Sequence, residues 1–473
     1  MASSPSSVGS EFPPVAASAL AAASTLRVPA VWLGVLGAVM VGWGGANAEF
    51  TFDPDGWPDP TLRWLGDLAP LPIDRVLIVA GTLALTLAWW NIRPTRSRGP
   101  VYAGVVIAAW CTPLLLAPPV LSPDITLYAD VGWELEQGHN PYLLGLAQSG
   151  GPYDSQVDPL WRGTGVAYPP LALLIMRWMA ALTGFHPYYG YIAMRIPVLL
   201  SVAALLWLVP RIAVAVGAHR RRALWMGLLN PLLLLHLVGG GHNDAAMIAV
   251  TVFAIWLVAR WPKLWVSLLL APLVVGVAMA LKQQGGLAVV AVAGLPLALD
   301  STRPALGRLA GLLALTWRTA VATVVALAAF IGICFATGLG TGWITWLDLM
   351  GKAATPAPLA MLSKLGAWLV AVNGGDATVF ARNAGLVTTG ILVAIVALIY
   401  LRFSDRPLAV VAWGSLAVAV GGQAMHPWYL PWSLVLLGLV PLTRRQRRWV
   451  YGLALAFTIW NAIQTVVWHG QYR

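Results

Sequence analysis

Long apolar runs, separated by short polar or basic stretches, recur along almost the whole chain. About 20 apolar residues in a helix cross the roughly 30 Å hydrocarbon core of a bilayer. The pattern therefore predicts an all-α integral membrane protein with about 13 transmembrane helices in a single domain, residues 27–473. The predicted spans are 28–46, 74–92, 100–118, 191–213, 223–239, 243–260, 265–281, 286–299, 313–336, 383–402, 408–421, 428–443 and 449–467. The runs 286–299 and 408–421 are short enough to be half-helices.

The segment 168–184 is apolar, but it starts with a tyrosine and a proline pair and contains Arg177. An arginine at the centre of a span costs roughly 3 kcal/mol. If this segment crossed the membrane, every later basic cluster would face the opposite side from Arg93, Arg96 and Arg98. We therefore expect 168–184 to lie in the membrane interface as a helix.

The basic residues gather in short clusters between apolar runs, as cytoplasmic anchors do. The clusters are Arg93/Arg96/Arg98, Arg220–Arg222, Arg260/Lys263, Arg303/Arg308, Arg402/Arg406 and Arg444–Arg448. If 168–184 lies in the interface, all of these clusters face one side of the membrane. Of the acidic residues, only Glu11, Asp300 and Asp405 lie on that side. This predicts a multi-pass plasma-membrane protein with its N-terminus inside and its C-terminus outside. Two large loops, 119–190 and 337–382, are expected on the periplasmic side.

The composition agrees with this class of protein. Hydrophobic residues make up 59% of the chain, charged residues only 10%, and the mean hydropathy is +0.75, which is far from a soluble domain. The net charge of +11 lies in the membrane-anchor clusters, and no soluble domain is predicted that could present a basic face to a nucleic acid. Residues 1–26 are rich in Ser, Ala and Pro and predict a disordered cytoplasmic tail. Cys111 and Cys334 lie inside apolar runs, as packing residues do.

The first predicted periplasmic loop opens with an acidic and aromatic stretch, Ser122–Asp130. A carboxylate at the membrane edge can take a proton from a sugar hydroxyl, and neighbouring rings can stack on the sugar. A solvated, capped loop would explain one aspartate but not the cluster. Asp124 is the candidate catalytic base, and the candidate sugar-binding residues of this loop are Tyr128, Asp130, Trp133, Tyr142 and Trp161.

A second polar element, residues 239–244 with the sequence Gly-Gly-Gly-His-Asn-Asp, forms a turn between two predicted spans. Glycines and an Asn/Asp cap would also suit a simple tight hairpin. Ionisable groups at such depth are nevertheless functional candidates. His242, Asn243 and Asp244 are therefore added to the candidate sugar-binding residues.

Basic side chains also occur at the outer ends of predicted spans, where the positive-inside tendency disfavours them. Arg195, Lys282 and Arg382 are of this kind, and His426 opens another outer turn. Snorkelling of the side chains to the headgroups is one explanation. The alternative is that they hold the phosphate of a donor by charge-assisted hydrogen bonds.

Metal and nucleotide motifs are weak in this sequence. It has no HxxxH or CxxC spacing and no glycine-rich loop followed by Lys-Ser/Thr. We therefore expect no metal and no other cofactor. An enzyme of this kind would use an activated donor that is itself lipid-soluble, such as a prenyl-phosphate sugar, whose phosphate is a good leaving group.

Four motifs carry a resemblance to a known family. They are Ser122–Tyr128 (SPDITLY), Gly138–Tyr142 (GHNPY), Tyr168–Leu171 (YPPL) and Gly241–Ala245 (GHNDA). They resemble the actinobacterial α-(1→6)-mannosyltransferases that use polyprenyl-phosphate mannose and belong to the GT-C class of glycosyltransferases. The resemblance runs from about residue 90 to 465, and the chain departs from it in carrying Asp130 where a small residue is usual.

The resemblance implies an inverting transfer of mannose to an α-(1→6)-mannan acceptor of lipomannan or lipoarabinomannan, with Asp124 as base on the periplasmic side. The implied partners are polyprenyl-phosphate mannose, a lipid-anchored mannan and membrane lipids. An α-(1→2)-mannosyl or arabinofuranosyl transferase of the same fold is an open alternative. A lipid-linked sugar flippase or transporter is a rival from another class, although it would need polar residues at the bilayer midplane.

Overall fold

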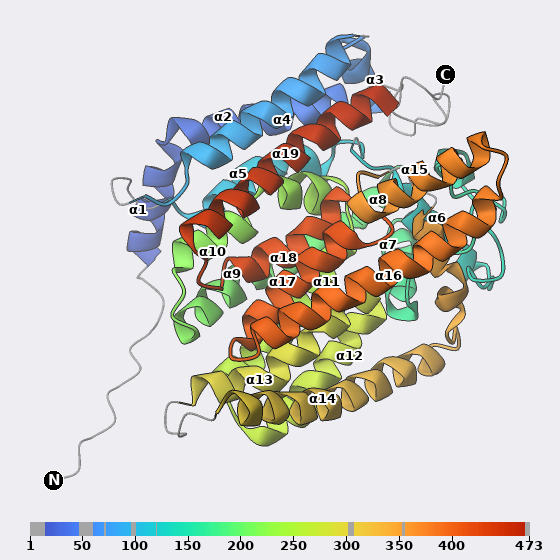
Figure 1. Ribbon diagram of the computed structural model, residues 1–473. Coiled ribbons are helices and arrows are strands. Elements are labelled where there is room, and N and C mark those ends of the chain that lie inside the picture. The colour runs from blue at the N-terminus through green and yellow to red at the C-terminus, as the bar shows by residue number, and fades with distance from the viewer. Residues whose placement is uncertain are drawn as a thin grey trace.

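The computed structural model describes residues 15–46, 60–70, 72–95, 101–119, 121–300, 307–351 and 355–468, and this part of the chain is helical without a β-strand (Figure 1). The elements are α1 (Val15–Leu26), α2 (Pro29–Gly44), α3 (Pro60–Asp67), α4 (Ile73–Asn91), α5 (Ala103–Leu115), α6 (Asp124–Glu136), η2 (Asp154–Gln156), α7 (Pro170–Leu182), α8 (Tyr189–Ala193), α9 (Arg195–Ala215), α10 (Arg220–Gly227), η3 (Leu233–Gly239), α11 (Asp244–Arg260), η4 (Val266–Leu270), α12 (Ala271–Leu281), η5 (Gln283–Ala288), α13 (Val289–Leu299), α14 (Arg308–Ala336), η6 (Gly342–Gly351), α15 (Pro358–Val372), α16 (Ala377–Arg402), α17 (Pro407–Gly421), η7 (Pro427–Tyr429), α18 (Leu430–Leu437) and α19 (Arg444–Trp468).

Five segments of the described chain are long and apolar enough to cross a bilayer. They are Ile73–Asn91, Tyr189–Ala215, Arg308–Ala336, Ala377–Arg402 and Arg444–Val467. Two further spans are obtained if α1–α2 and η3–α11, which bend by 67° and 111° at their breaks, each count as one. The chain is thus an all-helical, multi-pass membrane protein, but the predicted count of thirteen spans is not confirmed.

The difference in the count comes from breaks inside apolar runs. The predicted span 223–239 divides into α10 and the π-helical η3, because Pro231 lacks the backbone N–H that a continuous helix needs. The predicted span 428–443 contains the end of the 3-10 helix η7 and only eight α-helical residues, those of α18. The two runs considered as half-helices form α13, with 11 residues, and α17, with 15.

The two ends of the helix bundle differ in character. Figure 1 shows the arginine-bearing starts of α10, α14 and α19 and the arginine-bearing end of α16 at one end. The opposite end carries α6, α7 and α8 with their connecting loops. We call these the basic end and the loop end. Their separation agrees with the predicted clustering of arginines on one membrane face.

Small residues allow the first helices to pack closely. A Cβ atom added at Gly37 would lie 2.6 Å from the carbonyl oxygen of Gly81, so α2 and α4 meet backbone to backbone. At Gly34 an added Cβ would lie 2.2 Å from the Trp110 ring of α5, whose Nε1 donates to the carbonyl of Val31. Close approach at glycines is a common way for helices to associate in membranes.

The loop end has its own apolar core, built from α6, α7 and the segment between them. Helix α7 has 13 residues, or about 20 Å at 1.5 Å per residue, which is too short to cross the hydrocarbon core. Its Arg177 is half exposed and pairs with Glu136 of α6 at 2.8 Å. The position of this helix in the membrane interface stays a prediction.

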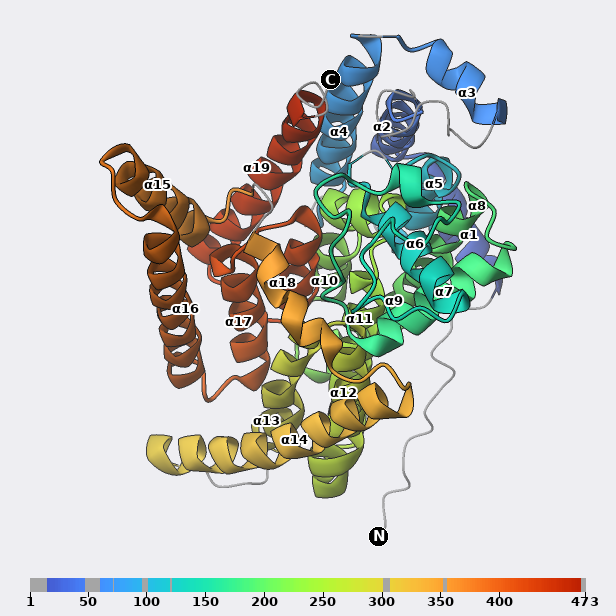
Figure 2. The same cartoon turned by 90° about the vertical axis from the view of Figure 1, so that its right-hand side faces the viewer.

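Two segments expected to be irregular contain helices. The predicted tail is helical from Val15 to Leu26, where alanines favour a helix and Thr25 Oγ1 accepts a hydrogen bond from the Tyr102 N–H at 3.0 Å. The predicted second loop, 337–382, contains η6 and α15, and α16 already begins at Ala377. Figure 2 shows α15 and α16 as a hairpin at the side of the bundle. Residues 1–14, Arg96, Arg98, Arg303 and Lys352 lie outside the described residues.

Candidate active site

Asp124 is the first residue of α6, and its partly exposed carboxyl group lines a cavity of about 40 Å³ at the loop end. The start of the helix is held in place by Thr126, whose hydroxyl donates to the carbonyls of Pro123 at 2.7 Å and Gln156 at 2.9 Å. The cavity is also lined by Trp161, Tyr168, His426, Trp428 and Tyr429. Asp124 therefore faces an aromatic pocket rather than open solvent.

The surroundings of Asp124 favour its protonated form. Burial, and then the negative charges of Asp158 and Asp244, raise the pKa of Asp124 to about 7, although Lys282 and the Ser122 hydroxyl act in the opposite direction. A carboxyl group with a pKa near the working pH is suited to accept a proton and release it again. This is the property that a general base needs.

A line of hydrogen-bonding side chains connects Asp124 to the glycine-rich turn. The Nδ1 atom of His242 lies 4.0 Å from the Asp124 carboxylate and 3.1 Å from the Tyr128 hydroxyl. The Tyr128 hydroxyl is in turn 3.2 Å from that of Tyr168. Gly241, with φ of +62°, brings His242 to this position, and an added Cβ there would collide with Ile125 at 2.3 Å. The first loop and the 239–244 turn thus meet at this site.

Trp428 joins two histidines from distant parts of the chain. The imidazole rings of His242 and His426 both stack on the Trp428 indole, with ring centroids at 3.9 and 4.4 Å. Burial, and then the charge of Lys282, lower the pKa of His426 to about 3. His426 is therefore a neutral imidazole at physiological pH and acts through one N–H group and one free nitrogen.

Lys282 is buried at the end of α12 and is neutralised by a residue distant in sequence. Its ammonium group lies 2.8 Å from both carboxylate oxygens of Asp244, and Trp432 Nε1 donates to the same carboxylate at 2.7 Å. The ammonium also lies 4.7 Å from the ring centroid of Tyr429 and 5.5 Å from that of Tyr168. The Lys282 ammonium thus lies among aromatic rings, in a cage beside the Asp124 cavity.

Three other polar candidates lie away from this cavity. The buried guanidinium of Arg195 donates to the backbone carbonyls of Leu115 and Gly239, so it fastens the polar turn to α5. The side chain of Asn243 donates to the carbonyl of Leu281 at 3.2 Å. Arg382 is exposed on α16, and neither Lys282 nor His426 is among its described contacts. The structure therefore brings Lys282 and His426 to the same site but does not bring Arg382 there.

Three candidates of the first loop lie inside the core of the loop end. Asp130 is fully buried and accepts a hydrogen bond from the Ala147 N–H at 2.8 Å. The Tyr142 hydroxyl donates to the carbonyl of Tyr168 at 2.8 Å, and Trp133 packs edge-on against Phe185. These side chains shape the loop that carries the pocket, whereas Trp161 lines the pocket itself.

Sequence reasoning did not select several residues that the structure places at the site. They are Asp158, Tyr168, Trp428, Tyr429 and Trp432. Tyr168 belongs to the Tyr-Pro-Pro motif and three of the others follow His426 closely in the sequence, so the dense aromatic segment 426–432 was the available signal. Within the described residues, no three His, Cys, Asp or Glu side chains form a group that could hold a metal ion. The expectation of a metal-independent reaction stays a prediction.

Comparisons with known proteins cover most of the chain. Residues 31–299 match the family profile described as alpha-(1->6)-mannopyranosyltransferase, N-terminal domain, and residues 356–462 match the MptB C-terminal domain. An alpha-(1->6)-mannopyranosyltransferase A of Mycobacterium tuberculosis is 28% identical over 89% of this chain and 82% of its own length. An alpha-(1->6)-mannopyranosyltransferase B of Corynebacterium glutamicum is 28% identical over 85% of this chain and 71% of its own length.

Among solved structures, the Archaeoglobus fulgidus oligosaccharyltransferase matches at 12% identity and a TM-score of 0.28, over 65% of this chain and 45% of the other. A likeness of this size carries no argument about the fold.

Proposed function

The chain belongs to the alpha-(1->6)-mannopyranosyltransferase family, and on this premise we propose that it moves mannose from polyprenyl-phosphate mannose to an α-(1→6)-mannan acceptor. The observation that carries the proposal is Asp124, a carboxyl group with a raised pKa at the wall of an aromatic pocket. A cationic side chain, Lys282, lies beside the pocket, next to the rings of Tyr168 and Tyr429 that line it. A base in the pocket and a cation beside it are what transfer from a phosphate-linked sugar requires.

In the proposed reaction the Asp124 carboxylate removes the proton from an acceptor hydroxyl. The oxygen then attacks C1 of the donor mannose, the bond from C1 to the phosphate oxygen breaks, and prenyl phosphate leaves with the electron pair. The configuration at C1 inverts in a single displacement. A positioned base contributes typically 10²–10⁴-fold to such a step.

Two residues are suited to receive the leaving phosphate. Lys282 offers an ammonium group whose charge Asp244 balances in the structure, and His426 offers an N–H donor without a charge of its own. The negative charge of the phosphate grows as the bond breaks, so both interactions strengthen in the transition state. Asp244 would orient the lysine, since it already binds the ammonium through both oxygens.

The cavity in this structure is small for the proposed substrates. Its volume of about 40 Å³ is enough for a few water molecules, whereas ordinary ligand pockets measure roughly 300–1,000 Å³. The proposed sugar-binding surface is the aromatic lining of this cavity, Trp161, Tyr168, Trp428 and Tyr429.

The remaining features of the proposal follow the family. We propose a GT-C-type fold, a lipid-anchored acceptor of the lipomannan or lipoarabinomannan type, and an active site facing the periplasm. Support for the orientation comes from the basic end, which lies opposite α6 (Figure 1), the helix that begins with Asp124, and which would face the cytoplasm under the positive-inside tendency.

The test is to incubate the purified protein with polyprenyl-phosphate mannose and a short α-(1→6)-mannoside and to determine the linkage of the product. We expect one added mannose in α-(1→6) linkage and none when GDP-mannose replaces the lipid donor. An α-(1→2) product, or transfer only from an arabinofuranosyl donor, would assign the chain to another activity. No product, together with donor movement between leaflets of a vesicle, would favour a flippase.

A further inference from the structure

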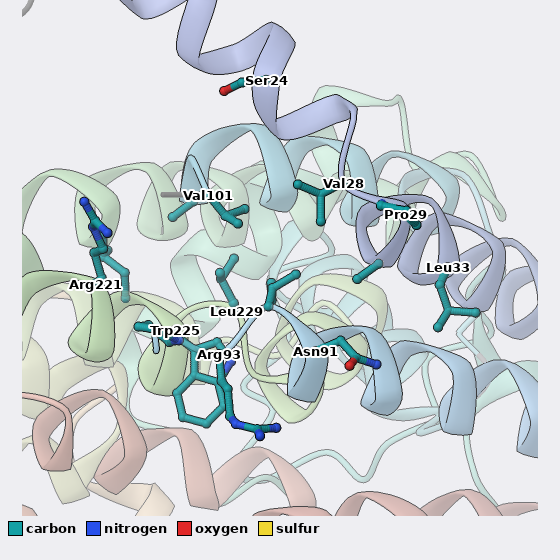
Figure 3. A pocket seen from close by; sticks show the side chains of 15 residues that line it. Ser24, Val28, Pro29, Leu33, Asn91, Arg93, Val101, Arg221, Trp225 and Leu229 are labelled. Carbon is teal, nitrogen blue, oxygen red and sulfur yellow. The ribbon is translucent and has the colours of Figure 1, made fainter. Parts of the chain in front are cut away.

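A second and larger cavity, of about 700 Å³, lies at the basic end. Its walls come from the α1–α2 junction, the end of α4, the start of α5, and α10. In Figure 3, Arg221, Trp225 and Arg93 lie on one side of the view, and Val28, Pro29 and Leu33 lie on the other. The cavity thus has a cationic side and an aliphatic side, and the proposed transfer reaction uses neither.

The two arginines have no acidic partner among the described residues. Arg93 donates to the backbone carbonyl of Trp90 at 3.2 Å, and its guanidinium lies 4.5 Å from the ring centroid of Trp90. The Arg221 side chain is exposed, and its guanidinium forms no hydrogen bond or ion pair with the described chain. None of the residues that line the cavity is acidic. The cationic side is therefore uncompensated, which favours an anionic ligand.

A pair of stacked tryptophans joins the two chain segments that carry the arginines. Trp89 of α4 and Trp225 of α10 stack with ring centroids at 4.4 Å, and each Nε1 donates to the backbone carbonyl of the other residue, at 2.9 and 2.8 Å. Arg93 and Arg221 each lie four residues from one of these rings, so the pair holds together the two backbone segments that carry the arginines.

The aliphatic side extends along α2. Leu33 is the fifth residue of this helix, so it lies about 6 Å further along it than Pro29. Basic pockets between transmembrane helices on the cytoplasmic side bind anionic lipid headgroups. A ligand with a charged head and an aliphatic chain would match both sides of this cavity, whereas a water-soluble phosphate would match only one.

We propose that this cavity is a binding site for one anionic phospholipid. Its phosphodiester lies beside Arg93 and Arg221, and one acyl chain lies along Val28 and Leu33. The site is distinct from the donor site, because the donor sugar reacts at the loop end and this cavity lies at the basic end (Figure 1).

The proposal is tested by native mass spectrometry of the purified full-length protein after delipidation and titration with phosphatidylglycerol. We expect the first phosphatidylglycerol molecule to bind with a much higher affinity than any further molecules of this lipid. At about 1 kcal/mol per arginine, the double variant Arg93→Gln/Arg221→Gln should bind it about 30-fold more weakly. The control Arg308→Gln/Arg402→Gln removes two arginines from the same end, outside the cavity lining, and should bind as the wild type does.

A third variant, Ala30→Trp, places an indole ring in the cavity without changing the charge and should weaken binding of the lipid. It keeps the test decisive if the double arginine variant does not fold, since wild-type affinity of a folded Ala30→Trp protein overturns the proposal. Equally tight binding of phosphatidylcholine with the same acyl chains would show that the arginines do not select an anionic headgroup. Displacement by glycerol 3-phosphate at a matched concentration would assign the site to a soluble phosphate instead.

Discussion

The ammonium nitrogen of Lys282 lies 2.8 Å from both carboxylate oxygens of Asp244, although the two residues are 38 positions apart in the sequence. Both side chains are almost fully buried. A buried ion pair contributes little net stability, but removing one partner leaves an uncompensated charge, at a cost of about 3–5 kcal/mol. A change at Lys282 therefore affects folding and the proposed phosphate site together.

A double variant separates these two effects. Lys282→Met should lower stability by about 3–5 kcal/mol and also reduce transfer. Lys282→Met/Asp244→Asn should recover most of the stability, because Trp432 can still donate to the side-chain oxygen at position 244. If Lys282 binds the donor phosphate, this double variant stays impaired, with a raised donor KM and an unchanged acceptor KM. Thermal unfolding and two-substrate kinetics give the two readouts, and full recovery of activity would restrict Lys282 to a structural role.

Asp124→Asn tests the proposed base. The amide keeps the size of the side chain but cannot accept the proton, so transfer should fall by about 10²–10⁴-fold with little change in thermal stability or donor binding. Asp405→Asn, which removes an exposed carboxylate paired with Arg406, serves as the matched control and should retain full activity. Near wild-type transfer by Asp124→Asn would refute the assignment.

The pH dependence of transfer should follow the raised pKa of Asp124. The base acts in its deprotonated form, so activity should be low in acid, rise through about pH 7 and level off above it. The charge of Asp158 contributes to the elevation. Asp158→Asn should therefore move the midpoint of the pH–rate profile to lower pH without removing the plateau. A midpoint that stays in place in this variant would mean that another group controls the profile.

The class of fold could be predicted from the sequence because apolar length is a local property. Runs such as 313–336 and 383–402 correspond to single long helices, α14 and α16. The number of spans could not be predicted in the same way. Whether the run 223–239 continues as one helix depends on how the neighbours of Pro231 pack, and hydropathy does not record that packing.

The candidate site was predictable where polar residues cluster against an apolar background. Asp124, His242, Lys282 and His426 were selected for this reason, and the structure places them around one pocket or its adjoining cage. The pairing of Lys282 with Asp244 could not be foreseen, because no sequence signal links positions on α12 and α11. Asp130 looked equivalent to Asp124 in the sequence. It lies six residues further along α6, on another face of the helix, and its side chain therefore points into the core of the loop end.

Glu134 should make the loop end sensitive to alkaline pH. It is fully buried, neither of its carboxylate oxygens has a hydrogen-bond partner among the described residues, and burial raises its pKa to about 9. An exposed glutamate titrates near about 4.3, so between these values the folded chain holds more protons than the unfolded chain. Stability from this group is therefore lost as the pH rises through that window. Glu134→Gln should reduce the fall in melting temperature between pH 5 and pH 9.

Glu136→Gln provides the comparison for that measurement. Glu136 lies on the same helix, but it is half exposed and pairs with Arg177. Its replacement should change stability by less than about 1 kcal/mol and leave the pH dependence as in the wild type. If both variants melt with the same pH dependence as the unmodified chain, Glu134 does not determine the alkaline sensitivity.

The orientation of the chain can be tested with single cysteines at the two ends of the bundle. Ser155 is exposed at the loop end and Gln446 lies in the first turn of α19 at the basic end. The native Cys111 and Cys334 are both buried, so background labelling should be low. A membrane-impermeant maleimide added to intact cells should modify Ser155→Cys and spare Gln446→Cys until the membrane is permeabilised. The reverse result would place Asp124 on the cytoplasmic side, where a periplasmic mannan could not reach it.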